Sequence, residues 1–421
     1  MPRNLLIPTL LLRACVLAGA LLPLSAVAAE RLTLAEAVRR ATQLAPGLDA
    51  QRAAIEAAQA EASRAGALPD PMLSIGIDNL PATGADAFDP SVDDMTMKRI
   101  GVRQEFPSAR KRATRVALAQ RRVGEAEAMA VAARLEVQRE AALAWIDAWQ
   151  AQREITVLEA LREQAQAAAR LARARAGAGA GSLADALAAD AAVLGIDTEL
   201  EQARGERDVA TARLGRWLPG ADADAIEGDP SFDALPVARA QLLARLDALA
   251  PVLGSGARVE SAAAAIAAAR AEKRPDWSVM AAYGQRDRDR GDMVSIEVGI
   301  ALPVFARQRQ DRGVLAREAE YRQALAQRDD ERRALAAQVD AAFARWEALK
   351  RQVALHETRL LPLATDRSAA ALGAYRGGGD LQPWLDARAA ELEVHRTHAG
   401  HLGELGRAWA GLAFLLPEAS P

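Results

Sequence analysis

Short segments in which apolar and polar positions alternate strictly occur twice in the chain, each time as a pair. In the first pair Leu73, Ile75 and Ile77 alternate with small or charged residues, and the run that ends at Phe106 alternates in the same way. The same pattern returns over residues 276–302. Strands that are apolar on one face and charged or small on the other are typical of a barrel wall between lipid and water. The pattern predicts two β-hairpins, at about residues 72–106 and 276–302.

An ordinary sheet with one face packed against helices would show the same alternation. Four strands per chain cannot close a barrel, and unpaired strand edges cannot lie in lipid. A membrane barrel would therefore have to be assembled from several chains, and the strand count alone does not give their number.

A long helical segment follows each hairpin. From Ser108 to about Arg175 there is no proline, which allows a helix of about 100 Å. The second segment carries a coiled-coil seam of alternating four- and three-residue steps. The seam consists of Leu335, Val339, Ala342, Trp346, Leu349, Val353, His356 and Leu360. A compact domain does not need helices of this length, whereas a structure that crosses the periplasm does.

The chain repeats itself after the first 29 residues. Leu44-Ala45-Pro46 recurs as Leu249-Ala250-Pro251, and Trp217-Leu218-Pro219 recurs as Leu415-Leu416-Pro417, each roughly 200 residues later. Each unit reads as a helix, two strands, a long helix, a glycine-rich turn and a returning helix. The turns fall at about residues 176–182 and 376–380. We therefore predict two internal repeats, 30–230 and 231–421, and a capping box of Thr33 and Glu36 at the first helix.

Residues 1–29 have the pattern of a secretory signal peptide. Arg3 precedes an apolar stretch, and Ala26-Val27-Ala28 offers a cleavage site. The single cysteine, Cys15, lies inside this segment. The mature chain is therefore expected to contain no thiol, and whether its N-terminus carries lipid stays open. After this segment no run of eighteen apolar residues occurs, which argues against a membrane-spanning helix.

Composition narrows the class of protein. Of the 421 residues, 26% are charged with a formal net charge of -3, so nothing indicates a nucleic-acid surface. Hydrophobic residues make up 51% but aromatic residues only 4%, which favours long, closely packed helices. There is no phosphate-binding loop and no GxSxG nucleophile motif. We expect neither an enzyme nor a cofactor.

In these features the chain resembles the TolC-type outer-membrane efflux channels. The residues that carry the resemblance are the opening Leu32–Val38, the junctions Phe106-Pro107 and Leu302-Pro303, and the two glycine turns. The resemblance implies a mainly α TolC-type fold with a small β part. A homotrimer would form one twelve-stranded outer-membrane β-barrel, four strands from each chain, above a long coiled-coil α-barrel in the periplasm.

The resemblance also implies partners and a function. The chain would be the passive exit channel of a tripartite system, contacting outer-membrane lipid, a periplasmic adaptor protein and, through it, an inner-membrane RND pump. Pro69-Asp70-Pro71 and residues 276–309 are most similar to the heavy-metal CzcC/CusC branch, so heavy-metal cations are the expected cargo. The turn Ser108–Arg112 departs from that branch because it lacks a glycine. Alternatives are a channel for organic drugs or secreted substrates, and a periplasmic coiled-coil adaptor or scaffold.

The glycine turns are the predicted adaptor-docking tips. A plain helix–helix turn would favour glycine equally, but each turn is followed by a polar residue and two leucines four residues apart. Ser182 and Asp380 are expected to cap the returning helices. The predicted docking residues are Gly177, Gly179, Gly181, Ser182, Leu183, Gly377, Gly378, Gly379, Asp380 and Leu381.

The resemblance places carboxylates at the periplasmic mouth of the channel, and Asp185, Asp380 and Asp386 match that position. Rings of like charge would attract cations and repel one another, which gives a gate that opens readily. Solvated helix caps are the alternative.

No metal site is predicted, although some residues are candidates. Thioethers are soft metal ligands, and Met72, Met95, Met97, Met280 and Met293 lie in or beside the hairpins; flexible filling of the barrel rim is the alternative. His395, His398 and His401 are spaced by three, so a helix spreads them over roughly 120° and prevents all three from sharing a metal. His356, in the seam, is expected to pack in the core. The candidates are thus Met95, Met97, Met293, His395 and His398.

Overall fold

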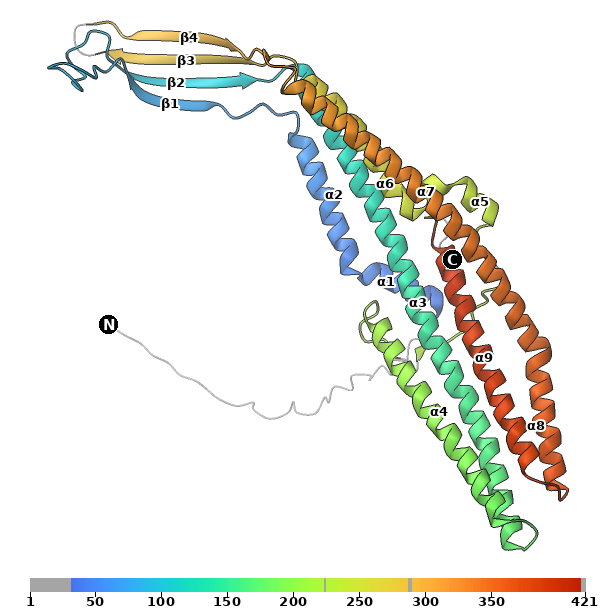
Figure 1. Ribbon diagram of the computed structural model, residues 1–421. Coiled ribbons are helices and arrows are strands. Elements are labelled where there is room, and N and C mark those ends of the chain that lie inside the picture. The colour runs from blue at the N-terminus through green and yellow to red at the C-terminus, as the bar shows by residue number, and fades with distance from the viewer. Residues whose placement is uncertain (1–31, 223–224, 287–289, 418–421) are drawn as a thin grey trace, which may run out of the picture.

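The computed structural model describes residues 32–222, 225–286 and 290–417; the predicted signal peptide, with Cys15, lies outside the described residues. The molecule is elongated, with a β-sheet at one end and helices that run from it to two turns at the other end (Figure 1). This arrangement confirms the mainly α fold with a small β part.

The first half contains four helices and two strands. Thr33 caps the first helix, since its side chain accepts from the Glu36 backbone N–H at 3.3 Å. The Glu36 carboxylate does not complete the predicted capping box, because it accepts from Arg39 and Arg40 instead. The elements are α1 (Leu34–Leu44), α2 (Pro46–Arg64), β1 (Met72–Asp78), β2 (Met97–Phe106), α3 (Ala109–Gly177) and α4 (Leu183–Gly215).

The second half repeats this order, but its long helix is divided by a π-helical turn. Its elements are α5 (Arg239–Ala244), a 3-10 turn (Leu246–Ala248), α6 (Ala250–Ala271), β3 (Trp277–Arg286), β4 (Met293–Ile300), α7 (Gln310–Leu355), a π-helical turn (His356–Leu360), α8 (Leu361–Arg376) and α9 (Gln382–Ala413). The coiled-coil seam is largely buried as predicted, with Ala342 and Leu360 half-buried.

The longest helix, α3, has 69 residues, which corresponds to about 100 Å. It packs against α6 near the sheet and against α4 and α9 nearer the turns, so one helix connects the sheet to the turns. This confirms the length that the proline-free segment predicts.

The four strands form one antiparallel sheet in the order β1-β2-β3-β4. Ile100 of β2 pairs with Ile75 of β1 and with Tyr283 of β3, and Tyr283 pairs with Val294 of β4. Both predicted hairpins are confirmed, and the β2–β3 pairing joins the two halves of the chain. The edges of β1 and β4 have no strand beside them in the described chain.

The main hydrophobic core lies in the middle of the helical part, and it contains most of the buried tryptophan and phenylalanine side chains. Four tryptophan indoles each donate a hydrogen bond to a backbone carbonyl, one just before α1 and three in the segment between α4 and α5. The pairs are Trp145 to Leu32 at 2.8 Å, Trp149 to Gly228 at 3.0 Å, Trp346 to Phe232 at 2.8 Å and Trp409 to Ala234 at 2.8 Å. These bonds fasten the link between the two halves across α3, α7 and α9, and we call this level the collar.

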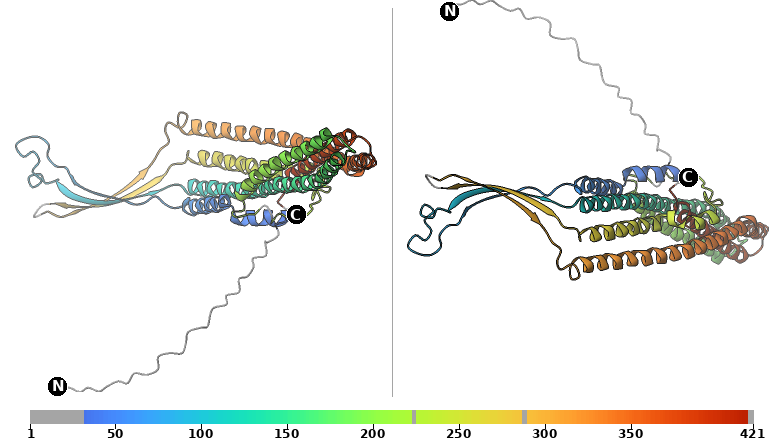
Figure 2. Two further views of the ribbon diagram at one scale, coloured as in Figure 1. Left: turned by 90° about the horizontal axis from the view of Figure 1, so that it is seen from below. Right: turned by 90° about the horizontal axis from the view of Figure 1, so that it is seen from above.

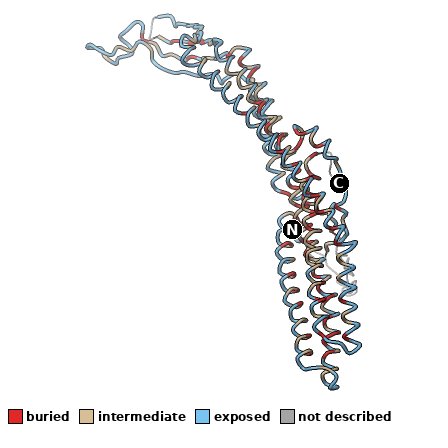
Figure 3. Tube along the Cα trace, turned by 45° about the vertical axis from the view of Figure 1, so that its right-hand side comes forward, coloured by how far each residue is buried: buried red, intermediate tan, exposed pale blue. Residues whose placement is uncertain are grey.

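Burial falls off sharply from the collar toward the sheet, whereas smaller buried clusters continue toward the turns. The sheet is mostly exposed in Figure 3, and α2 has no buried residue at all. Two views from below and above show that the sheet extends beyond the helices and that no helix lies across either of its faces (Figure 2). Among the described residues no helix is both long enough and apolar enough to pass through a membrane.

Candidate functional site

One face of the sheet is apolar and uncovered. The exposed fractions of Ile75, Ile296 and Val294 are 77%, 76% and 72%. Since no helix covers this face, the alternative of an ordinary sheet packed on helices is wrong. The strand register places on it Leu73, Ile75, Ile77, Ile100, Val102, Phe106, Trp277, Val279, Ala281, Tyr283, Val294, Ile296, Val298 and Ile300. Apolar surface in water costs about 25 cal/mol per Å², so this face is made for an apolar environment.

Aromatic residues stand near both ends of the apolar face. Phe106 and Trp277 are paired where the strands meet the helices. Tyr283 lies further along β3, six residues from Trp277, or about 20 Å at the usual rise of a strand. Aromatic girdles flank the apolar band of strands that cross an outer membrane, and this spacing fits such a band.

The opposite face of the sheet is polar and charged. Arg99 pairs with Asp78 at 3.2 Å, and Arg103 pairs with Glu297 at 3.6 Å. Both guanidinium groups also donate to the Met280 thioether, at 3.0 and 3.8 Å. Opposite charges with their hydrogen bonds indicate a face that contacts water.

The candidate methionines lie at separate positions in and beside the strands of the sheet. Met97 and Met293 lie on either side of Gly284, because Met293 pairs with Gly284 and the Met97 sulfur occupies the space where a Gly284 side chain would be. Met72 and Met95 are exposed. The thioether of Met280 is already engaged by the two arginines.

At the far end of the molecule, the first glycine turn joins α3 to α4. Gly177 is the last residue of α3, and Gly179 has φ +72°, a conformation that side chains rarely adopt. The Ser182 hydroxyl accepts from the Asp185 N–H at 3.0 Å, and the Asp185 carboxylate accepts from the Ser182 N–H at 3.4 Å. This reciprocal capping box confirms the predicted cap.

The second turn joins α8 to α9 and is built differently. Gly378 has φ +105°, and Gly379 lies so close to the Ala374 carbonyl that a Cβ would meet it at 3.0 Å. The prediction that Asp380 caps α9 is wrong. The cap position is Leu381, with no side-chain hydrogen bond, because Pro383 fixes the first turn of α9 one residue later than expected.

The leucines of the two turns are not equivalent either. The exposed fraction of Leu183 is 71%, and that of Leu187 is 61%. Leu381 is only 2% exposed and packs with Tyr375 and Trp384 in the cluster near the turns. Leu381 is therefore a core residue, and its side chain offers no docking surface in this chain.

Arg175 connects the two turns. Its guanidinium lies 4.5 Å from the centre of the Tyr375 ring and donates to the Tyr375 carbonyl at 2.5 Å and to the Ala180 carbonyl at 3.2 Å. The sequence reasoning missed this contact. The signal available was a basic residue and a lone tyrosine, each just before a glycine cluster.

The acidic residues predicted for the gate occupy separate positions. Asp185 belongs to the capping box at the first turn. Asp380 lies in the second turn, and Asp386, one turn into α9, accepts from the Gln382 amide at 2.7 Å. Each is exposed or half-buried within one chain.

The histidines form a group that the sequence did not predict. His356 stacks on His398 with ring centres 5.9 Å apart and meets His401 edge-on at 5.0 Å. The predicted core position of His356 is confirmed, since it is buried. Over the described ranges, no three side chains of histidine, aspartate or glutamate are arranged to hold a metal ion.

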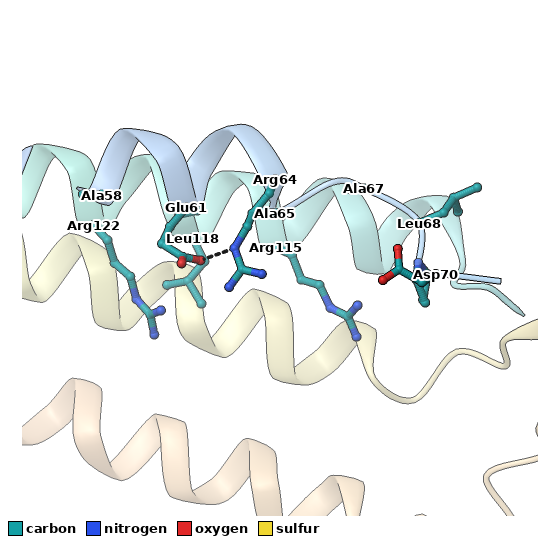
Figure 4. A pocket seen from close by; sticks show the side chains of 12 residues that line it. Ala58, Glu61, Arg64, Ala65, Ala67, Leu68, Asp70, Arg115, Leu118 and Arg122 are labelled. Atoms are coloured by element: carbon teal, nitrogen blue, oxygen red, sulfur yellow. Dashed lines mark hydrogen bonds and ion pairs between the residues drawn. The ribbon is translucent and has the colours of Figure 1, made fainter. Parts of the chain in front are cut away.

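An open groove lies between α2 and α3, just below the sheet (Figure 4). Its volume is about 770 Å³ and it is lined by Glu61 and Arg64 of α2 and by Arg115, Leu118 and Arg122 of α3. Glu61 pairs with Arg64 at 2.7 Å, and Arg115 pairs with Glu272 at 3.1 Å. These charges are paired on a helix surface, which is not the arrangement of a catalytic acid and base.

A sheet with an exposed apolar face and a polar opposite face, continued by helices of about 100 Å, is the construction of an outer-membrane channel with a periplasmic extension. The chain belongs to the outer membrane efflux protein family, whose model matches residues 37–219 and 238–417. Proteins of this family are channels and not enzymes. The protein is an efflux channel of the outer membrane, and its helical part lies in the periplasm.

Solved structures of outer-membrane channels share the fold. The outer-membrane channel OprN superposes with a TM-score of 0.77 at 18% identity, over 92% of this chain and 91% of that chain. The outer membrane protein VceC from Vibrio cholerae gives 0.73 at 21% identity, over 91% and 97%. CusC, described as forming a transmembrane channel, gives 0.72 at 14% identity, over 91% and 92%. No curated protein sequence shows a significant match to the chain.

Proposed function

We propose that three copies of this chain form the exit duct of a tripartite efflux system for heavy-metal cations. The observation that carries the assembly is the sheet: it has four strands, two open edges and an uncovered apolar face. Unpaired backbone groups at an edge cannot lie in lipid. Joining β1 of one copy to β4 of the next removes every edge, and three copies of a four-stranded sheet give a twelve-stranded barrel.

The helical part supports the same assembly. Helix α2 has no buried residue, and the groove of Figure 4 lies open beside it. On α4, further from the turn, Leu194 and Val209 are exposed by 65% and 54%. Neighbouring copies would cover these surfaces, since large apolar side chains in a row mark a contact surface.

Adaptor docking belongs to the first turn in this proposal. Leu183 and Leu187 stand exposed on one face of α4, directly after the Ser182–Asp185 capping box. An adaptor helix with an apolar stripe would cover them. The substitutions Leu183→Asp and Leu187→Asp should abolish co-purification of the adaptor, and Leu44→Asp, at an exposed leucine of α1 that has no part in either proposed contact, serves as the matched control.

The acidic residues give the duct its preference for cations. In a trimer Asp185, Asp380 and Asp386 would each occur three times around the periplasmic mouth. Like charges around a narrow opening attract cations from solution and repel one another. Both effects suit a gate that admits metal ions and opens readily.

The cargo rests on the resemblance to the heavy-metal branch and on this acidic mouth. A strain that lacks the chain should become sensitive to copper, silver, cobalt, zinc or cadmium salts, and the intact gene should restore growth. Sensitivity to organic drugs alone would contradict the metal cargo and favour the alternative channel for organic compounds.

The assembly is tested on the protein itself. The full-length protein, extracted from the outer-membrane fraction in detergent, should have the mass of three chains in native mass spectrometry. A monomer in detergent would contradict the trimer while leaving the family unchanged.

A further inference from the structure

Three histidines from two helical segments gather just below the collar. His356 is the first residue of the π-helical turn between α7 and α8, while His398 and His401 lie on α9. The first pair of rings is stacked, with an angle of 18° between the planes, and the second pair is perpendicular. We call His356, His398 and His401 the histidine cluster.

One ring nitrogen of each histidine in the cluster is shielded from solvent. The Nδ1 atoms of all three rings are buried and have no hydrogen-bond partner in the described part of the chain. The side chain of His398 is only 12% exposed. A protonated imidazole needs a partner for each N–H, so each added proton would leave a buried, charged donor unpaired.

The charges that face the cluster compensate for such protons only in part. On the π-helical turn, Glu357 is the facing carboxylate, 3.8 Å from His398 Nε2 and half exposed to solvent. On α3, Arg153 adds positive charge near His398. On α9 itself, His395 lies on the other side of His398 and has Glu391 and Arg388 as its charged neighbours.

Other charges near the cluster already have partners. Arg153 pairs with Asp229 at 2.6 Å, and Lys350 of α7 donates to the Asp233 carbonyl at 2.6 Å, in the pocket that Glu357 also lines.

Arg396 of α9 pairs with Glu199 of α4 at 3.3 Å and with Glu154 of α3 at 3.9 Å. These groups therefore form a separate ion-pair cluster on an adjacent stretch of α9.

Beside the cluster, the π-helical turn interrupts the regular α-helix that α7 and α8 would otherwise form. A π-helical turn is wider than an α-helical turn and often marks a functional position. Pro362 follows it in the first turn of α8 and removes a backbone donor. A change in packing at His356 can therefore change the direction of α8, which continues to the second glycine turn.

We propose that the histidine cluster is a proton-sensitive hinge, which holds the π-helical turn against α9 at neutral pH and releases α8 when the periplasm becomes acidic. Neutral rings pack well at these distances. Two protonated rings would repel each other in a site with little water. The release would loosen the turn-bearing ends of α8 and α9 while the collar above stays fixed by its tryptophans. The inference concerns packing within one chain and does not depend on the cargo or the number of chains.

The sign of the pH dependence follows from the packed and separated states. Burial, followed by the nearby His356 and Arg153, lowers the pKa of His398 from 6.5 to about 4. Burial and the nearby His401 also lower the pKa of His356. A separated ring regains its ordinary pKa, so the separated state binds more protons below pH 6.5. The packing is fully favoured above about pH 6.5 and is progressively lost as the pH falls to about 4.

Hydrogen–deuterium exchange on the full-length protein in detergent tests the hinge, with EDTA in every buffer to remove metals. Protection of residues 352–364 and 394–404 is compared at about pH 7.5 and pH 4.5, after correction for intrinsic exchange and relative to residues 155–170 of α3. The shift of His398 alone predicts a loss of protection between about tenfold and a hundredfold at the lower pH.

Variants separate the cluster from general acid effects. The triple variant His356→Gln, His398→Gln and His401→Gln should lose the pH response. His395→Gln, on the same helix but outside the ring contacts, should keep it. Glu357→Gln should leave protection at neutral pH unchanged and enlarge the loss at acidic pH, which tests the hinge independently of how the triple variant folds. Equal protection of the native protein at both pH values, or an unchanged response in the triple variant, would overturn the proposal.

Discussion

At the residue scale, a few polar contacts decide how the two turns are built. Ser182 and Asp185 satisfy each other at the first turn, whereas the second turn depends on Pro383 and the buried Leu381. Arg175 joins the turns by combining a ring contact with hydrogen bonds to two carbonyls. Substituting Arg175 would remove all three contacts together, so a single substitution should have a measurable local effect on the two turns.

The substitution Arg175→Ala should loosen both turns. A charge-assisted hydrogen bond contributes about 1.5–3 kcal/mol, and 1.4 kcal/mol corresponds to about a tenfold change in an equilibrium. Hydrogen exchange of residues 174–184 and 372–382 should therefore accelerate at least about tenfold. Arg173→Ala, which removes only the exposed pair with Asp190, is the control and should have little effect on the second turn.

The two capping positions should respond differently to the same change. Ser182→Ala removes a side-chain cap and should destabilise the start of α4 by about 1 kcal/mol. Asp380→Ala removes no cap and should leave the start of α9 unchanged. Local amide exchange at residues 183–187 and 382–386 measures both effects; equal losses would contradict the difference between the turns.

At the element scale, the two faces of the sheet meet different environments, and adjacent residues of a strand lie on opposite faces. Ile296 is exposed on the apolar face, and Ser295 beside it belongs to the polar face with Glu297. Because the side-chain period of a strand is two, neighbouring positions report on opposite environments.

Ile296→Arg should therefore prevent membrane assembly, while Ser295→Arg should be tolerated. An arginine facing the middle of a bilayer costs about 2–4 kcal/mol per chain, and an assembly of several chains incurs that cost in each. The fraction of protein recovered in the outer membrane as an assembled species measures the difference. Equal recovery of both variants would show that the apolar face does not contact lipid.

At the scale of the whole molecule, the open edges of the sheet are the main support for the proposed assembly. Strands β2 and β3 lie inside the sheet, whereas β1 and β4 lie at its edges. The collar holds the two halves of the chain together through tryptophan hydrogen bonds. A closed ring of chains is the arrangement that leaves neither the edges nor α2 exposed.

Cross-linking at the edges should reveal the number of chains. With Ile75→Cys and Ile296→Cys combined, a flexible bismaleimide should join neighbouring chains into covalent dimers and trimers but nothing larger. Val102→Cys with Ala281→Cys, which are paired within one chain, should give no products between chains. Ladders beyond three chains would contradict the trimer.

Local patterns predicted most of the elements correctly. The alternation at Leu73–Ile77 and the proline-free segment after Ser108 each depend on neighbouring residues, so they could be recognised from the sequence. Asp380 was misjudged because a cap depends on where the helix begins, and Pro383 moved that position. Arg175 with Tyr375, and His356 with His398, could not be paired from the sequence, because about 200 and 42 residues separate them and no short-range rule connects them.

Residue periodicity and the positions of proline and glycine were enough to predict the length of α3, the two hairpins, the two-faced strands and the family resemblance. The three-dimensional packing was needed to show that no helix covers the apolar face of the sheet, that Leu183 is exposed while Leu381 is buried, and that three histidines meet at a π-helical turn. These features depend on how helices pack side by side, and the burial of a side chain is set by neighbours that are distant in the sequence.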